Sequence, residues 1–207
     1  MEIIPLQYGE SFLSEDMIFA SGNKNKFREI VFKLYLVKDE GKLILVDAGC
    51  ETMPGFEMKN FIGTVGVLEN INIRPEEITD VLITHSHHDH IECVKYFKNA
   101  VIYIQKDEYE SGKQYIPSDF NVNIFEQEFA IGTNIKILKI GGHSKGSCVV
   151  EIKDNNKTHV IIGDECYLRE CLTNKIPTGS SINPEASMNF IKKYSDKKYN
   201  VLLCHDN

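Results

Sequence analysis

Residues 84–90 read Thr-His-Ser-His-His-Asp-His and hold four of the seven histidines of the chain. The apolar run Val81-Leu82-Ile83 comes directly before them and predicts a buried strand. An expression-tag remnant would lie at a terminus, and a chance run of surface histidines would not be expected to follow such a strand. The stretch therefore predicts a metal site.

Two pairs of side chains in this stretch can each bind a metal ion. In an extended chain, residues two apart point the same way, so His85 and His87 can hold one ion together. Asp89 and His90 follow where the strand should turn into a helix, and from there they can reach a second ion beside the first. Imidazole nitrogens and carboxylate oxygens suit Zn²⁺ and related transition metals.

The composition is that of an ordinary soluble globular protein. The chain has 207 residues, of which 42% are hydrophobic and 26% charged, which excludes disordered and fibrous classes. Its formal net charge is −7, without a stripe of Lys and Arg, so no nucleic-acid partner is expected. We predict a single domain over residues 1–207.

The cellular location is predicted from what the sequence lacks. Met1 to Pro5 does not read as the start of a signal peptide, and no window holds the roughly 18 to 20 apolar residues of a membrane span. The six cysteines are scattered and read as reduced thiols. These features predict a cytoplasmic protein without a membrane partner, and they leave the oligomeric state open.

Strand and helix signals alternate along the rest of the chain. Strands are predicted over 27–37, 42–47, 80–84, 101–105, 134–140, 148–153, 158–163 and 201–204, with turns at 39–41 and 154–156. Helices are predicted over 74–78, 91–98, 106–113 and 183–194, and a loop with a short helix over 53–66. Both halves run strands first and helices later, which predicts two sheets packed face to face with helices outside.

Three further potential ligands also follow apolar strands. His143 lies in a Gly-rich turn, Asp164 ends the strand predicted over 158–163, and His205 follows the last strand. Singly, each is more often a turn residue than a ligand. The shared pattern favours ligands, since functional residues gather on loops held by a rigid scaffold.

These motifs together resemble those of one family. Thr84 to His90 matches the HxHxDH motif of the metallo-β-lactamase superfamily, and His143, Asp164 and His205 match its three later metal positions in order. Val46-Asp47-Ala48-Gly49 resembles the Asp-Gly turn that supports the site in that family. The resemblance implies an α/β (α+β) fold, a four-layer αββα sandwich with the site on one edge.

The resemblance also implies a dinuclear centre in which each ion has three ligands of its own and one carboxylate bridges the two. The ligands that it implies are His85, His87 and His143 for one ion, Asp89, His90 and His205 for the other, and Asp164 as the bridge. In the family a hydroxide between the ions attacks a carbonyl or phosphoryl centre. Two divalent ions can lower the pKa of bound water toward ~7 and polarise a substrate oxygen. We expect Zn²⁺ first, with Mn and Fe also compatible with these ligands.

Tyr167 points to one branch of the family. It lies three residues beyond the bridging position, as in the N-acyl homoserine lactonases that the chain resembles, where the phenol hydrogen-bonds the substrate carbonyl. Plain packing is the alternative role. Residues 72–78 and 102–110 are also similar to that branch. The implied catalytic residues are Tyr167, which polarises the carbonyl, and Asp89 or Asp164, which shuttles the proton.

Several other functions stay open. Residues 142–146 are also similar to the glyoxalase II-like thioesterases, but that group has a further C-terminal helical region and this sequence ends two residues after His205. Phosphodiester hydrolysis is disfavoured by the acidic chain. A catalytically silent metal-binding sensor or interaction domain is the non-enzyme alternative. The expected partner is a small-molecule ester, lactone or thioester.

Other residues near the motifs are predicted to play lesser roles. His88 occupies a variable position of the motif and should point away from the metals. Asp47 is a candidate acceptor for a ligand imidazole. An apolar substrate wall, with core packing as the alternative, is predicted from Phe12, Phe19, Phe27, Met53 and Phe56.

Overall fold

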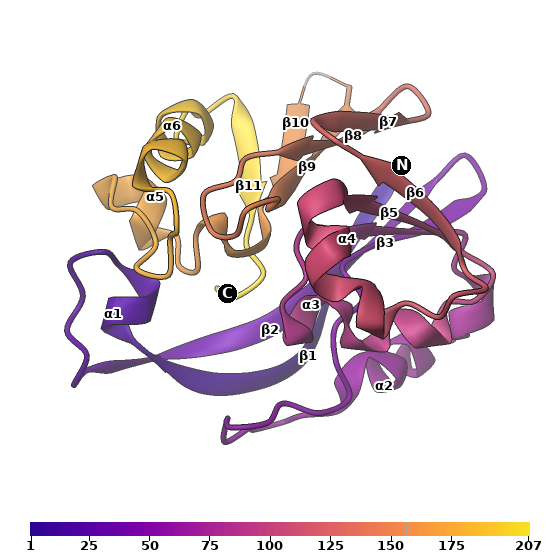
Figure 1. Cartoon of the computed structure of the whole chain (residues 1–207), viewed down its shortest axis with the longest axis horizontal. Coiled ribbons are helices and arrows are strands. Elements are labelled where there is room, and N and C mark those ends of the chain that lie inside the picture. Colours follow the sequence, from indigo (N-terminus) through magenta and orange to yellow (C-terminus); the bar gives the residue numbers. More distant parts are fainter. Residues whose placement is uncertain (156) are drawn as a thin grey trace.

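In a computed structural model that describes residues 1–155 and 157–207, the strands form two mixed sheets (Figure 1). The first sheet has the order β1 (Glu2–Ser14), β2 (Phe27–Asp39), β3 (Lys42–Val46), β4 (Asp80–Ile83), β5 (Val101–Gln105) and β6 (Asn121–Phe125). The second has the order β11 (Tyr199–Leu202), β10 (Lys157–Ile161), β9 (Cys148–Asp154), β8 (Ile135–Lys139) and β7 (Glu128–Ile131).

Short helices connect and cover the sheets. They are α1 (Glu15–Ile18), α2 (Gly63–Asn70), α3 (His88–Ile91), α4 (Lys106–Gly112), α5 (Glu170–Asn174) and α6 (Pro184–Tyr194), with 3₁₀ turns at Pro75–Glu77, Glu92–Tyr96, Lys113–Tyr115 and Gly163–Glu165. Helix α6 begins as predicted, because the Asn183 side chain accepts a hydrogen bond from Ala186 N and Pro184 occupies the first position. Within the described residues, no helix has the length and apolar character needed to cross a membrane.

Strand pairing is antiparallel where the connections are short. β1, β2 and β3 are antiparallel, and β3 to β6 run parallel to one another. In the second sheet β7 to β10 are antiparallel, and β11 lies parallel to β10. The predicted β2–β3 hairpin is confirmed: Glu40 and Gly41 take positive φ angles of 48° and 79°, as a two-residue hairpin turn requires.

Three hydrophobic clusters fill the spaces between the layers. Alternate residues of one strand enter different clusters, because successive side chains point to opposite faces of a sheet. In β4, Val81 packs in the cluster that α2 and α3 cover, whereas Leu82 packs between the sheets. In β9, Val150 also packs between the sheets, whereas Val149 joins the cluster under α5 and α6. The order is helix, sheet, sheet, helix, as Figure 1 shows.

The structure departs from the predicted elements at a few places. Where a helix was predicted over 91–98, α3 ends at Ile91 and a 3₁₀ turn follows over Glu92–Tyr96, although Ile91, Val94 and Phe97 are buried as expected. Strand β1 was not predicted, since Pro5 and Gly9 weaken a strand pattern; β1 lies at a sheet edge, where Pro is tolerated. The turn predicted over 154–156 includes Asn156, which lies outside the described residues.

Candidate metal centre

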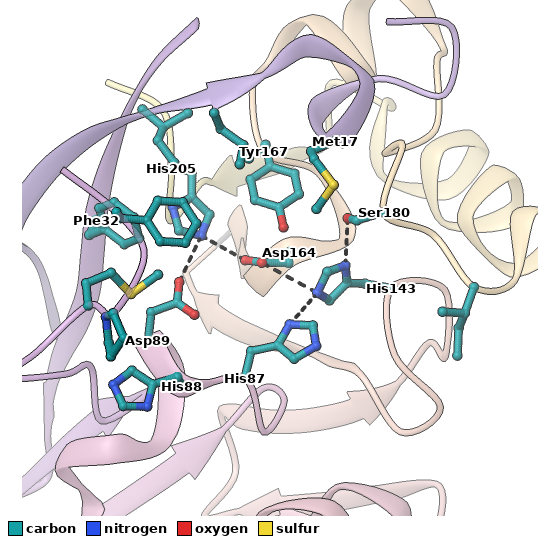
Figure 2. Close-up of a pocket in the computed structure, with 16 residues that line it drawn as sticks. Met17, Phe32, His87, His88, Asp89, His143, Asp164, Tyr167, Ser180 and His205 are labelled. Carbon is teal, nitrogen blue, oxygen red and sulfur yellow. Dashed lines mark hydrogen bonds and ion pairs between the residues drawn. The ribbon is translucent and has the colours of Figure 1, made fainter. Parts of the chain in front are cut away.

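Strand ends from both sheets bring the predicted ligands to one place (Figure 2). His85 follows β4, Asp164 lies in the 3₁₀ turn after β10, and His205 follows β11. His143 lies in the turn between β8 and β9. Cys148 N donates a 2.8 Å hydrogen bond to the carbonyl of Thr84, which ties the second sheet to the histidine motif of the first.

Four side chains form the first group of potential ligands. The members are His85, His87, His143 and Asp164, each of which offers one atom within 4.8 Å of the others. His87 Nδ1 lies 3.0 Å from His85 Nε2 and 2.9 Å from His143 Nε2. Asp164 Oδ2 lies 3.7 Å from His85 Nε2 and 3.5 Å from His143 Nε2. Three of the four residues are buried, and His87 faces the solvent side.

Asp89, His90 and His205 form the second group, again within 4.8 Å of one another. Asp89 Oδ2 lies 3.4 Å from His90 Nε2 and 3.8 Å from His205 Nε2. Asp164 meets this group with its other oxygen: Oδ1 lies 3.1 Å from His90 Nε2 and 2.9 Å from His205 Nε2. The two carboxylate oxygens of Asp164 therefore face different groups.

These separations fit metal coordination. Zinc ligands about 2.0–2.1 Å from the ion at tetrahedral corners lie about 3.3 Å from one another, close to the spacings in both groups. His90 Nε2 is buried and, although Asp164 Oδ1 lies 3.1 Å away, it makes no well-aligned hydrogen bond with any of the described residues. A buried imidazole nitrogen normally has a partner, and a cation between His90 and Asp164 would supply one.

Burial and charge set the protonation of the two groups differently. Burial lowers the pKa of His85 well below its usual value and that of His143 to about 4, so both are neutral near pH 7 and free to bind a metal. Burial would also lower the pKa of His90, but nearby carboxylates, Asp164 above all, raise it well above its usual value. Burial opposes ionisation of Asp164, yet His205 and His90 hold its pKa well below the usual range.

Asp47 holds the strand end and one imidazole in place. One of its oxygens accepts a 2.7 Å hydrogen bond from Thr84 N, and the other lies 2.8 Å from His90 Nδ1. Its φ of 65° is in the left-handed region, which Asp tolerates better than most residues. The contact that the sequence predicted between Asp47 and a ligand imidazole is therefore present.

Two supports of His143 were not predicted from the sequence. His143 Nδ1 lies 3.0 Å from Ser180 Oγ (Figure 2), and Glu165 accepts hydrogen bonds from Gly142 N and His143 N. Ser180 lies in a loop 37 positions further along the chain, so spacing carried no signal for it. Glu165 neighbours Asp164, and burial raises its pKa to about 7.

Tyr167 lies beside both groups. Its ring stacks on His205, with centroids 5.1 Å apart and an interplanar angle of 29°, and its hydroxyl points toward Asp164 in Figure 2. Burial, with a further contribution from Asp164, raises its pKa well above the usual value. The phenol is therefore neutral and keeps its proton for donation.

A cavity of about 570 Å³ opens onto the ligands and has a mostly apolar wall. The wall residues are Leu13, Met17, Ile30, Phe32, Met53, Pro54, Phe56 and Ile182. Met53 and Phe56 lie in the wall as predicted. Phe12 and Phe27 are exposed away from it, and Phe19 packs against the core. No Lys or Arg of the described residues lines this cavity.

The remaining histidine of the motif does not join the groups. His88 points away from Asp164 in Figure 2, and its Nε2 lies 2.8 Å from the carbonyl oxygen of Thr52. It also lines the cavity. The six cysteines are buried and free, and none of them lines the cavity.

The sequence is similar to known metallo-hydrolases over most of its length. Residues 34–204 match the family model described as the Metallo-beta-lactamase superfamily. A probable metallo-hydrolase of Methanocaldococcus jannaschii is 28% identical over 163 residues, which cover 79% of this chain and 70% of that protein. An N-acyl homoserine lactonase of Bacillus thuringiensis is 24% identical over 216 residues, which cover 91% of this chain and 84% of the lactonase.

Solved structures show a matching fold. An N-acyl homoserine lactone hydrolase with the product N-hexanoyl-L-homoserine at its catalytic metal centre has a TM-score of 0.85 and 21% identity, covering 99% of this chain and 92% of that one. A probable metal-dependent hydrolase from Staphylococcus aureus has a TM-score of 0.84 and 21% identity, covering 99% and 89%. The predicted αββα fold and the similarity to the lactonase branch are confirmed.

Proposed function

Because the chain belongs to the metallo-β-lactamase superfamily, we propose that it is a dinuclear hydrolase that opens a lactone or cleaves a related ester. The observation that carries this proposal is the placement of Asp164, whose Oδ2 faces the first ligand group and whose Oδ1 faces the second. A carboxylate placed in this way can hold two cations close together. The ligand groups, the neutral phenol beside them and the apolar cavity belong to one site.

The proposed ligands are the seven residues predicted from the sequence. His85, His87 and His143 would hold the first ion, Asp89, His90 and His205 would hold the second, and Asp164 would contact both. We propose Zn²⁺, with Mn and Fe compatible with the same donors. When bound, two such ions supply hydroxide at neutral pH and polarise the substrate oxygen.

Two protein groups are proposed to act on the substrate itself. The Tyr167 hydroxyl donates a hydrogen bond to the substrate carbonyl oxygen, and this bond strengthens as negative charge develops there. Asp89 lines the cavity, so its carboxylate can accept the proton of the hydroxide once this has added to the carbonyl carbon and can pass that proton to the leaving alkoxide. Asp164 is the alternative proton carrier, although its contacts with His143 and His205 leave its carboxylate less free to accept a proton.

The cavity wall favours an uncharged substrate with an apolar chain. Its aliphatic and aromatic side chains can bury such a chain, as in the N-acyl homoserine lactones of the relatives. A glutathione thioester or a phosphodiester carries negative charge, and no Lys or Arg of the described residues lines this cavity to pair with it. We therefore propose a small-molecule lactone as the substrate class and place the thioester second.

Turnover of a substrate panel tests this proposal. Zn²⁺-loaded protein is assayed with an N-acyl homoserine lactone, a glutathione thioester and an aryl phosphodiester, before and after chelation. We expect kcat/KM for the lactone to exceed the other two by more than about 10-fold, which corresponds to ~1.4 kcal/mol. Chelation of the metal should abolish lactone turnover.

Two results of this panel would contradict the proposed substrate. Preferential turnover of the thioester would assign the chain to a glyoxalase II-like activity. No turnover of any substrate, with both metal ions bound, would favour a metal-binding module without catalysis.

A further inference from the structure

Helix α4 carries a buried carboxylate that the reaction proposed above does not use. Glu108 is 2% exposed and accepts four hydrogen bonds. Its Oε2 accepts from Ser86 N at 2.8 Å and from Ser86 Oγ at 2.7 Å. Its Oε1 accepts from Ser144 Oγ at 2.6 Å and from Gly146 N at 2.8 Å. Each carboxylate oxygen therefore serves one backbone N–H and one hydroxyl.

These donors lie in the two loops that carry the three histidines of the first ligand group. Ser86 lies between His85 and His87 in the sequence, and Ser144 follows His143 directly. One carboxylate thus connects the loops that hold all three histidines of that group. The connection spans 22 residues on one side and 36 on the other, so it exists only in the folded chain.

Glycines allow α4 to lie close against both loops. A Cβ added at Gly112 in α4 would come within 2.7 Å of the Ser86 Cβ, and one added at Gly146 would come within 2.9 Å of the Glu108 Cγ in α4. Real side chains do not tolerate such approaches, so both positions need the absence of a side chain. The helix is therefore in direct contact with each loop and does not bridge a gap between them.

The second ligand group is supported by other residues. Asp47 contacts His90, and the carbonyl of Val31 lies 2.9 Å from His205 Nδ1. The Tyr8 hydroxyl donates a hydrogen bond to the Asp89 carbonyl. None of these contacts involves α4. Asp47 also reaches the first group, because the Thr84 hydroxyl donates a hydrogen bond to it and lies 3.1 Å from His85 Nδ1. Among the described residues, the hydrogen bonds of the Glu108 carboxylate all go to the two loops of the first group.

We propose that Glu108 is a positioning residue for the first metal site alone. It fixes the distance between the His85–His87 loop and the His143 loop, so that three imidazoles are placed for one ion before the ion binds. The inference rests on the proposed two-metal centre. It predicts that a change at Glu108 weakens one of two binding steps and leaves the other near its original affinity.

Glu108→Gln is the direct test, because the new amide cannot accept all four hydrogen bonds in either of its two orientations. Whichever oxygen becomes the NH₂ group, that group faces a backbone N–H, either of Ser86 or of Gly146. Stepwise Zn²⁺ affinities are measured against a competing chelator. We expect one step to weaken by about 10- to 100-fold, as for other residues that orient metal ligands. His143→Ala should abolish the same step, which identifies it.

The control is Glu110→Gln on the same helix. Glu110 is exposed and pairs with Lys113, so both affinities should match those of the unaltered protein. If Glu108→Gln does not fold, Ser144→Ala removes a single donor to Glu108 and should weaken the same step by a smaller factor. Circular dichroism of the metal-free variants establishes that the fold is kept.

The possible results separate the inference from the proposed function. If the unaltered protein binds fewer than two Zn²⁺ ions, the two-metal proposal itself fails. If it binds two, but Glu108→Gln (or Ser144→Ala in its place) weakens both steps equally or neither, the positioning role of Glu108 is wrong. The positioning role is supported if the variant selectively weakens the Zn²⁺ binding step that His143→Ala abolishes.

Discussion

Replacing Asp164 by alanine is expected to remove bound metal and hydrolytic activity together. The substitution deletes both oxygens that face the two ligand groups, 2.9 Å from His205 Nε2 and 3.5 Å from His143 Nε2. Bound metal lowers the pKa of water from 15.7 to about 7, so its loss should reduce kcat/KM by more than about 1,000-fold. Elemental analysis of the purified variant and lactone turnover measure the two effects in one preparation.

Asp119→Ala is the matched control, since Asp119 is an exposed aspartate in the loop before β6. This variant should retain its bound metal and its kcat/KM for the lactone. The proposed mechanism would be contradicted by an Asp164→Ala variant that is depleted of metal and yet hydrolyses the lactone at the original rate.

Tyr167→Phe is expected to separate rate from metal content. The phenylalanine ring can keep the stacking on His205, whereas the hydroxyl that points toward Asp164 is lost (Figure 2). Removing one preorganised donor to a developing oxyanion costs about 100-fold or more in kcat. We therefore expect kcat to fall by about 100-fold while the metal content of the protein is unchanged.

A second buried tyrosine provides the control for this variant. Tyr194 in α6 donates a hydrogen bond to Glu151 and lies outside the cavity, so Tyr194→Phe should lower stability by about 1 kcal/mol without changing kcat. An unaltered kcat in Tyr167→Phe would assign Tyr167 to packing only.

The strand ends explain why so much of the site could be predicted. Each predicted ligand loop follows or precedes a short apolar strand, and apolar runs such as Val81-Leu82-Ile83 predict these strands. Within the second sheet, β10 and β11 are parallel and β9 is antiparallel to β10, so Asp164, His205 and the turn that holds His143 lie at one edge. The hydrogen bond from Cys148 N to the Thr84 carbonyl brings that edge to the end of β4. The structure brings together the seven side chains that were predicted as ligands, and their role as ligands stays a proposal.

The rest of the site depends on burial that no local pattern reveals. Glu108 lies in the segment Lys-Asp-Glu-Tyr-Glu, which reads as a charged surface helix, and only the fold shows that one of these acids is buried. Ser180 and Ile182 reach the cavity from the loop before α6. Strand β1 is hidden from the sequence for a different reason. Pro5 and Gly9 argue against a strand, and only its place at the sheet edge makes them acceptable.

The central claim is that two metal ions act together at this site. Metal-free protein titrated with Zn²⁺, with lactone hydrolysis followed at each addition, tests it most directly. We predict that bound metal rises to two ions per chain and that most of the activity appears with the second. Activity that is complete at one ion per chain, or that persists in the metal-free protein, would contradict the claim.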